Sequence, residues 1–215
     1  MKVNNQIENI LFDLGGVLYN IDYQLTYHEM AGLLQVNDAD FTTIPELKEI
    51  ERSYNSGTMR TETFLWRLQQ LSTGPMPLPQ QLIRAWNAML LGWHEGIFDF
   101  LRELSDSYNL YLFSNINDLH FKYLQKELDQ LGKDDFFFTL FHGTAFSHIV
   151  KYVKPDVSSF KNIIESFGIE AGKTLFIDDI VINVEGAREA GLHTCHHDRA
   201  KSIQQELFSY IELVC

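Results

Sequence analysis

The chain has 215 residues, of which 45% are hydrophobic and 21% charged. That composition supplies enough apolar side chains for a buried core and excludes an intrinsically disordered chain. Asp and Glu number 29 against 17 Lys and Arg, so the formal net charge is −12 at pH 7. Because an acidic surface repels phosphate backbones and anionic lipid heads, we expect neither nucleic acid nor a membrane as a partner.

The cysteines and the absence of a long apolar run indicate the compartment. There are two cysteines, Cys195 and Cys215, which do not make a disulfide framework of the kind found in small secreted domains. No stretch reaches the ~20 apolar residues of a membrane span. We therefore expect a cytoplasmic globular protein.

Four short apolar runs, each followed by a polar residue, predict strands that are buried on both faces, as in a parallel sheet. They are residues 10–12 before Asp13, 110–113 before Ser114, 136–141 before His142 and 174–177 before Asp178. Amphipathic stretches of helical length lie between them, including 97–107 and a segment that ends before Gly168, a predicted C-cap. This alternation predicts an α/β fold with a doubly wound, mainly parallel, Rossmann-like sheet.

Residues 23–93 interrupt the alternation. Helical patterns cover residues 25–34, 45–54, 61–71 and 80–91. We find no convincing strand among them, and the proline-rich stretch 74–79 is predicted to be a loop. The sequence therefore predicts an α/β core formed by residues 1–22 and 94–215, with a helical cap subdomain, residues 23–93, inserted after the first strand.

Acidic residues follow the first and last of these strands. Ligands of a parallel sheet bind beyond the carboxyl ends of its strands, where Asp13, Asp178 and Asp179 are expected to meet. Three neighbouring carboxylates resist joint ionisation, and a divalent cation relieves that repulsion. Oxygen ligands suit Mg²⁺, whose shell the carbonyl of Gly15 would complete.

A second set of residues at the same edge of the sheet suits an anion. Ser114 and Asn115 can donate hydrogen bonds after the second strand, and Lys154 can reach the same anion as a point charge. A carboxylate, a hydroxyl, a lysine and a metal-binding acidic pair together describe phosphoryl transfer through an aspartyl-phosphate.

Four segments resemble, in order, the motifs of the haloacid dehalogenase superfamily, and the resemblance spans essentially the whole chain. They are residues 12–18 (FDLGGVL), 113–115 (FSN), 154–156 (KPD) and 176–179 (FIDD) followed by Asn183. The first motif and residues 114–117 most resemble the sugar-phosphate phosphatase branch that includes α-glucose-1-phosphate phosphatase.

The resemblance implies a role for each site residue. Asp13 is the nucleophile and a Mg²⁺ ligand, and Lys154 both orients Asp13 and, with Ser114 and Asn115, holds the phosphoryl group. Asp178 binds the metal, and Asp179 binds it directly or through water. The implied activity is Mg²⁺-dependent hydrolysis of a small phosphorylated metabolite, a sugar phosphate, and we expect a monomer or a homodimer.

One position departs from the pattern. Most phosphatases of the superfamily carry a second Asp, the general acid, where this chain has Gly15. Asp22 and the cap side chains are candidates for the missing role. The gap leaves a catalytically silent phosphometabolite-binding module as an alternative. A metal-independent dehalogenase, in which Asp13 attacks carbon, is a further alternative.

Two other groups of residues have a simpler interpretation. His193, His196 and His197 are interpreted as strand-end or surface histidines rather than a transition-metal site. Basic cap residues are interpreted mainly as solvated helix faces, although each is also a candidate substrate contact. They are His28, Arg52, Arg60 and Arg67.

Overall fold

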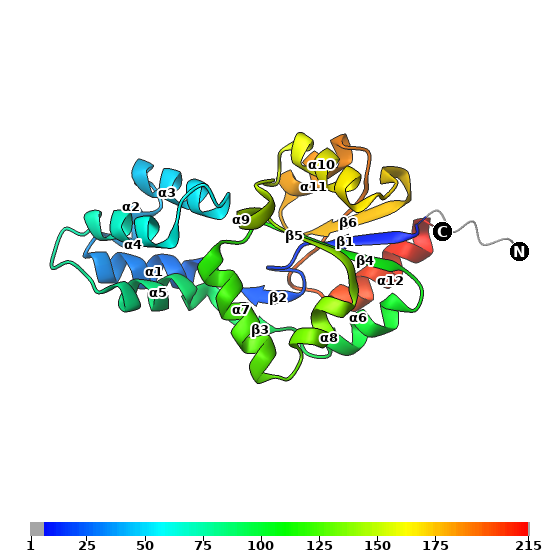
Figure 1. The fold of residues 1–215 in the computed structure, drawn as a ribbon, viewed down its shortest axis with the longest axis horizontal. Coiled ribbons are helices and arrows are strands. Elements are labelled where there is room, and N and C mark those ends of the chain that lie inside the picture. Colours follow the sequence, from blue (N-terminus) through cyan, green and yellow to red (C-terminus); the bar gives the residue numbers. More distant parts are fainter. Residues whose placement is uncertain (1–6, 215) are drawn as a thin grey trace, which may run out of the picture.

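A five-stranded parallel sheet forms the centre of the chain (Figure 1). The computed structural model describes residues 7–214, with side chains through residue 210. The sheet order is β5-β4-β1-β6-β7, and every neighbouring pair is parallel. The strands are β1 (Asn9–Phe12), β4 (Asn109–Ser114), β5 (Phe141–Phe146), β6 (Thr174–Asp178) and β7 (His193–His196). The predicted fold class is confirmed.

Helices cover both faces of the sheet, and the side chains of β1 explain why. Ile10 and Phe12 belong to the apolar cluster on one face, whereas Leu11 belongs to the cluster on the other. Alternating side chains point to opposite faces, so a strand covered on both sides must be apolar throughout. One face packs against α6 (Ile97–Ser105), α7 (Asp118–Gln130), α8 (Asp134–Thr139) and α12 (Ile203–Val214). The other packs against α10 (Val157–Phe167) and α11 (Val181–Glu189).

Capping residues set both ends of helix α10. Asp156 precedes it, and its side chain accepts a hydrogen bond from the backbone N–H of Ser158, which is N-capping. Gly168 ends the helix in the left-handed region at φ 64°, where glycine carries no Cβ penalty. The predicted C-cap is thus confirmed.

The predicted strand over residues 136–141 is wrong. Residues Asp134–Thr139 form helix α8, and the strand β5 begins at Phe141. A short apolar run does not by itself distinguish a buried strand from a buried helical turn. The acidic pair Asp134 and Asp135 occupies the first turn of α8, where it interacts favourably with the helix dipole.

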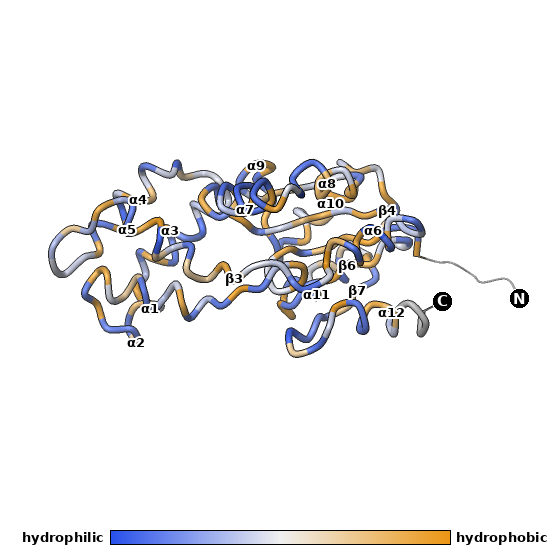
Figure 2. The backbone as a smooth tube through the Cα atoms, turned by 90° about the horizontal axis from the view of Figure 1, so that it is seen from below, coloured by the Kyte–Doolittle hydropathy of each residue, from blue (hydrophilic) through white to orange (hydrophobic). Residues whose placement is uncertain are grey.

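Helices of the first half of the chain pack around an apolar cluster of their own, beside the sheet (Figure 1). They are α1 (Tyr23–Leu34), α2 (Asp38–Phe41), α3 (Pro45–Asn55), α4 (Thr61–Gln70) and α5 (Pro79–Trp86). In Figure 2 the tube alternates between hydrophobic and hydrophilic residues along α1, as expected for a helix with one buried face. The stacked rings of Tyr54 and Phe64, with centroids 3.9 Å apart, join α3 to α4.

A short antiparallel pair of strands joins these helices to the sheet. Strand β2 (Tyr19–Ile21) pairs with β3 (Leu90–Trp93). The predicted helix over residues 80–91 is therefore too long, because α5 ends at Trp86, a 3₁₀ turn follows (Asn87–Met89) and β3 begins at Leu90. The expectation that residues 23–93 contain no strand is wrong for the same reason: β3 is short and its partner lies some 70 residues away in sequence.

The remaining elements are α9 (Ser147–Val150) and a 3₁₀ turn (Ala171–Lys173). Within residues 7–214, no helix combines the length and the apolar character that crossing a membrane requires.

Candidate active site

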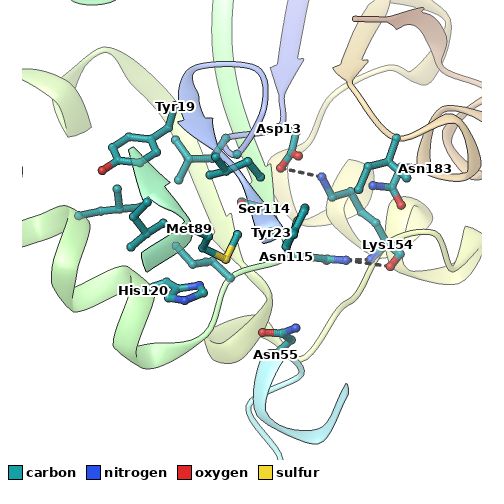
Figure 3. Close-up of a pocket in the computed structure, with 17 residues that line it drawn as sticks. Asp13, Tyr19, Tyr23, Asn55, Met89, Ser114, Asn115, His120, Lys154 and Asn183 are labelled. Carbon is teal, nitrogen blue, oxygen red and sulfur yellow. Dashed lines mark hydrogen bonds and ion pairs between the residues drawn. The ribbon is translucent and has the colours of Figure 1, made fainter. Parts of the chain in front are cut away.

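The carboxyl ends of the three central strands meet at one edge of the sheet. Asp13 directly follows β1, Ser114 is the last residue of β4 and Asp178 is the last of β6. The strand order changes direction around β1, and such a switch point leaves a crevice where ligands bind. A cavity of about 190 Å³ opens there, lined by Asp13, Ser114 and residues of the neighbouring helices (Figure 3).

A buried lysine links two of the carboxylates. The side chain of Lys154 is 1% exposed, and its Nζ lies 2.8 Å from Asp13 Oδ1 and 2.6 Å from Asp178 Oδ2. Although burial lowers the pKa of Lys154, its two carboxylate partners raise it above the ordinary value. Asp178 also accepts hydrogen bonds from Asn183 Nδ2, at 3.1 and 3.0 Å, and from the Ile180 N–H at 2.8 Å. The lysine is therefore charged and fixed in place.

The surroundings of Asp13 disfavour its ionised form, even though Lys154 lies beside it. Burial is the largest cause that raises the pKa of Asp13; Lys154 lowers it, the charges of Asp178 and Asp179 raise it, and the net result is a pKa of about 7. A raised pKa means that the ionised carboxylate is disfavoured in this surrounding. A further positive charge beside Asp13 would favour its ionised form.

The third carboxylate supplies a direct sign of a cation site. Carboxylate oxygens of Asp13, Asp178 and Asp179 lie within 4.8 Å of one another. Asp179 Oδ1 is buried and has no hydrogen-bond partner, an arrangement that is costly unless a ligand satisfies it. An oxygen-only cluster with an unpaired buried oxygen fits a hard divalent cation. In the described part of the chain, this is the only group of three such side chains so arranged.

The predicted anion-binding residues also line the cavity, together with Gly15. Ser114 offers its hydroxyl there. The side-chain amide of Asn115 is already engaged, because its Nδ2 donates to the Lys154 carbonyl at 2.8 Å and its Oδ1 accepts from the Lys154 N–H at 3.0 Å (Figure 3). Asn115 thus positions the backbone of Lys154 and retains only its remaining N–H groups for an anion.

Sequence reasoning missed several cavity residues. Asn55, at the end of α3, and Tyr23 and Met89 line the cavity beside His120. Polar residues at helix ends are common, so nothing in the sequence singles out Asn55. Arg199 was also missed: its guanidinium pairs with Asp179 Oδ2, with Nε at 2.7 Å.

The basic residues proposed as cap contacts lie elsewhere. None of them lines the cavity. Arg67 pairs with Glu49 at 2.9 Å, Arg60 with Glu62 at 3.7 Å and His28 with Asp38 at 2.6 Å. Apart from Arg67, which is half-buried, these residues are exposed, in agreement with the solvated-face interpretation.

The three clustered histidines bind separate partners. His193 Nε2 lies 3.0 Å from the Gly172 carbonyl and His196 Nε2 lies 3.0 Å from the Asp179 carbonyl. His197 Nδ1 lies 2.6 Å from Glu206 Oε2. Cys195 between them is buried.

Comparison with known proteins places this site in a family. Residues 7–191 match the model of the haloacid dehalogenase-like hydrolases. The chain belongs to this family. It is therefore a hydrolase whose predicted family resemblance is confirmed over most of its length.

Individual members of the family cover nearly the whole chain. The chain is 26% identical over 210 residues to D-ribitol-5-phosphate phosphatase from Bacteroides thetaiotaomicron, covering 94% of this chain and 97% of that protein. The crystal structure of a haloacid dehalogenase family enzyme from the same organism matches with a TM-score of 0.84 and 30% identity, covering 94% and 98% of the two chains. Another structure of that enzyme, in complex with magnesium and inorganic phosphate, matches with a TM-score of 0.77 and 28% identity, covering 91% and 96%.

Proposed function

We propose that this hydrolase is a Mg²⁺-dependent phosphatase that cleaves a small sugar or sugar-alcohol phosphate through an aspartyl-phosphate on Asp13. The observation that carries the proposal is the buried Lys154, held between Asp13 and Asp178 beside a small cavity. The phosphatase activity named for the Bacteroides relative, and the magnesium and phosphate bound by the related enzyme, support it.

In the first half of the reaction a carboxylate oxygen of Asp13 attacks phosphorus. The P–O bond to the ester oxygen breaks, and the departing alkoxide takes up a proton. Water then attacks the phosphorus of the acyl phosphate, which releases inorganic phosphate and restores Asp13. Lys154 fixes the attacking carboxylate, and Lys154, Ser114 and the free N–H groups of Asn115 offer positive charge and donors to the phosphoryl oxygens.

The cation belongs to the three-carboxylate cluster. Asp13, Asp178 and Asp179, with the carbonyl of Gly15 as a further candidate, would hold Mg²⁺. When bound, the ion neutralises charge on the phosphoryl group and on the cluster. A dehalogenase that needs no metal has no use for the unpaired oxygen of Asp179.

The general acid is not at its usual place. A Cβ on Gly15 would stand 3.1 Å from Ile21 Cδ1, so an apolar side chain fills the adjoining space. Asp22 does not substitute for it, because its carboxylate caps α1 by accepting from the Gln24 N–H at 2.9 Å and does not line the cavity. The proton therefore comes from another cavity group or from water. Gly15 remains the single observation that favours a silent binding module.

We further propose that residues 23–93 act as a cap over a core of residues 1–22 and 94–215. The separate apolar cluster of α1 to α5 and the position of Asn55 and Met89 in the cavity wall support this division. A cap of this kind excludes bulk water and selects the ester.

A cytoplasmic location and a monomeric or homodimeric state complete the proposal, with the cysteine content supporting the cytoplasmic location.

A panel of sugar and sugar-alcohol phosphates, assayed with Mg²⁺ and with a chelator, tests the proposal against an Asp13→Asn control. Phosphate release that needs Mg²⁺ and disappears in the variant is the expected result. Metal-dependent binding of the same compounds without release would favour the binding module instead.

A further inference from the structure

A buried chain of hydrogen bonds crosses the wall of the cavity and joins α7 to α5 and α3. His120 Nε2 lies 3.0 Å from the carbonyl of Trp86, and His120 Nδ1 lies 3.1 Å from Asn117 Nδ2. Asn117 Nδ2 lies 3.0 Å from Asn55 Oδ1. His120 and Asn117 are 7% and 1% exposed, so water does not compete for these groups.

Two backbone groups, one that can only accept and one that can only donate, determine the position of every proton in this chain of hydrogen bonds. The Trp86 carbonyl can only accept, so His120 carries its proton on Nε2 and its Nδ1 is an acceptor. The backbone N–H of His120 can only donate, and it lies 3.0 Å from Asn117 Oδ1, which makes that atom the oxygen. Asn117 Nδ2 is then the amide nitrogen, and it donates both to His120 Nδ1 and to Asn55 Oδ1. The assignments from the two ends agree.

The orientation of Asn55 follows from this chain. Because its Oδ1 accepts from Asn117, its Nδ2 is the atom left for the cavity, which Asn55 lines (Figure 3). Among the described residues, that nitrogen has no hydrogen-bond partner. The backbone of Asn55 is fixed as well, since its carbonyl accepts from Ser147 Oγ at 2.6 Å. Asn55 therefore presents a pair of N–H donors, with a defined direction, to whatever occupies the cavity.

We propose that Asn55 is a specificity-determining residue whose amide N–H donates to a hydroxyl oxygen on the alcohol part of the substrate, and that His120 and Asn117 are positioning residues that orient it. The inference rests on the proposed phosphatase function and assigns a recognition element to it. Burial lowers the pKa of His120 to about 4, so the neutral ring that the chain requires persists at physiological pH.

The kinetic test compares D-ribitol 5-phosphate with phenyl phosphate, whose alcohol part carries no additional hydroxyl. Asn55→Asp keeps the oxygen that faces Asn117 and replaces the donor by an acceptor. We expect the ratio of kcat/KM for ribitol 5-phosphate to that for phenyl phosphate to fall about tenfold, the size of one lost hydrogen bond. The added negative charge affects kcat/KM for both esters, so its effect cancels in the ratio. Asn162→Asp, the same change on α10 away from the cavity, is the matched control.

His120→Gln tests the positioning role. Glutamine keeps a donor for the Trp86 carbonyl and loses the acceptor for Asn117. We expect the same ratio to fall about threefold or more, through KM for ribitol 5-phosphate. A purely structural role would lower the melting temperature without changing the ratio. A ratio within about twofold of the unsubstituted protein in Asn55→Asp would overturn the proposal.

A measurement that needs no turnover separates this inference from the proposed function. The ¹⁵N shifts of His120 report its tautomer, and we expect the proton on Nε2. A proton on Nδ1 would reverse the amide of Asn117 and present the wrong atom of Asn55, which would refute the inference. If the protein hydrolysed neither ester, the proposed function would fail, and the tautomer would still decide the orientation of Asn55.

Discussion

Replacing Asp13 by Asn should abolish turnover and at the same time stabilise the metal-free protein. Asparagine keeps the shape of the side chain and removes the carboxylate that we propose attacks phosphorus. It also removes one negative charge from a buried cluster of three. Activity and stability should therefore change in opposite directions, because the arrangement that prepares Asp13 for a cation and a phosphate is unfavourable without them.

The pKa of Asp13 sets the size of the effect. It rises from 3.8 to about 7 on folding, so the folded protein holds this proton more tightly than the unfolded chain. The contribution of Asp13 to stability is then greatest at low pH and is lost as the pH rises from about 4 through about 7. Above that range, ionised Asp13 costs about 4 kcal/mol, which is the upper limit of the gain from Asp13→Asn. At about pH 5 the gain should be less than half as large.

Thermal unfolding in a chelator at about pH 8 and about pH 5 measures this difference. For a chain of this length, about 4 kcal/mol corresponds to a rise in melting temperature of about 8–16 °C. Asp129→Asn, on the exposed surface of α7, controls for the loss of one negative charge. Excess Mg²⁺ should stabilise the unsubstituted protein more than the variant. A variant that melts at or below the unsubstituted protein in chelator at the higher pH would refute this account of the cluster.

Two further substitutions probe the same site. Lys154→Met should destabilise the metal-free protein by about 3–5 kcal/mol, because two buried carboxylates lose their shared cation; urea unfolding measures this, and an unchanged midpoint would contradict it. Gly15→Asp should raise kcat for an alkyl phosphate at least about tenfold relative to an aryl phosphate by supplying a general acid. Combining it with Ile21→Val makes room for the new side chain. Equal effects on both esters would show that proton transfer to the leaving group does not limit the rate.

The sequence predicted the sheet well because its buried strands are continuous apolar runs. The three runs that precede Asp13, Ser114 and Asp178 became β1, β4 and β6. The failures have a common cause. Residues 136–141 are a short apolar run that suits a helix as well as a strand, and the end of the 80–91 pattern becomes β3 through pairing with the distant β2. Local pattern does not contain that information.

Some residues of the candidate site could also be predicted from the sequence, and others could not. Strand ends in a parallel sheet meet at one edge, so the proximity of Asp13 to Asp178 follows from topology, and the structure brings them together as expected. Asn55 reaches the cavity only through the packing of α3 on α7 and on Ser147. Arg199 reaches Asp179 from the loop after β7. Such contacts between distant elements have no signature in the sequence.

The charges of the site explain how so acidic a protein can bind an anion. Three clustered carboxylates face two cationic side chains, Lys154 and Arg199, and leave one net negative charge in a largely buried place. A phosphate would be repelled there. A divalent cation reverses the sign of the site, and in low dielectric this reversal changes the interaction with a phosphate dianion by several kcal/mol. Metal and phosphate should therefore bind cooperatively, each raising the affinity for the other by the same factor. Asp13→Asn makes the empty site neutral, so it should bind inorganic phosphate without metal more tightly than the unsubstituted protein does.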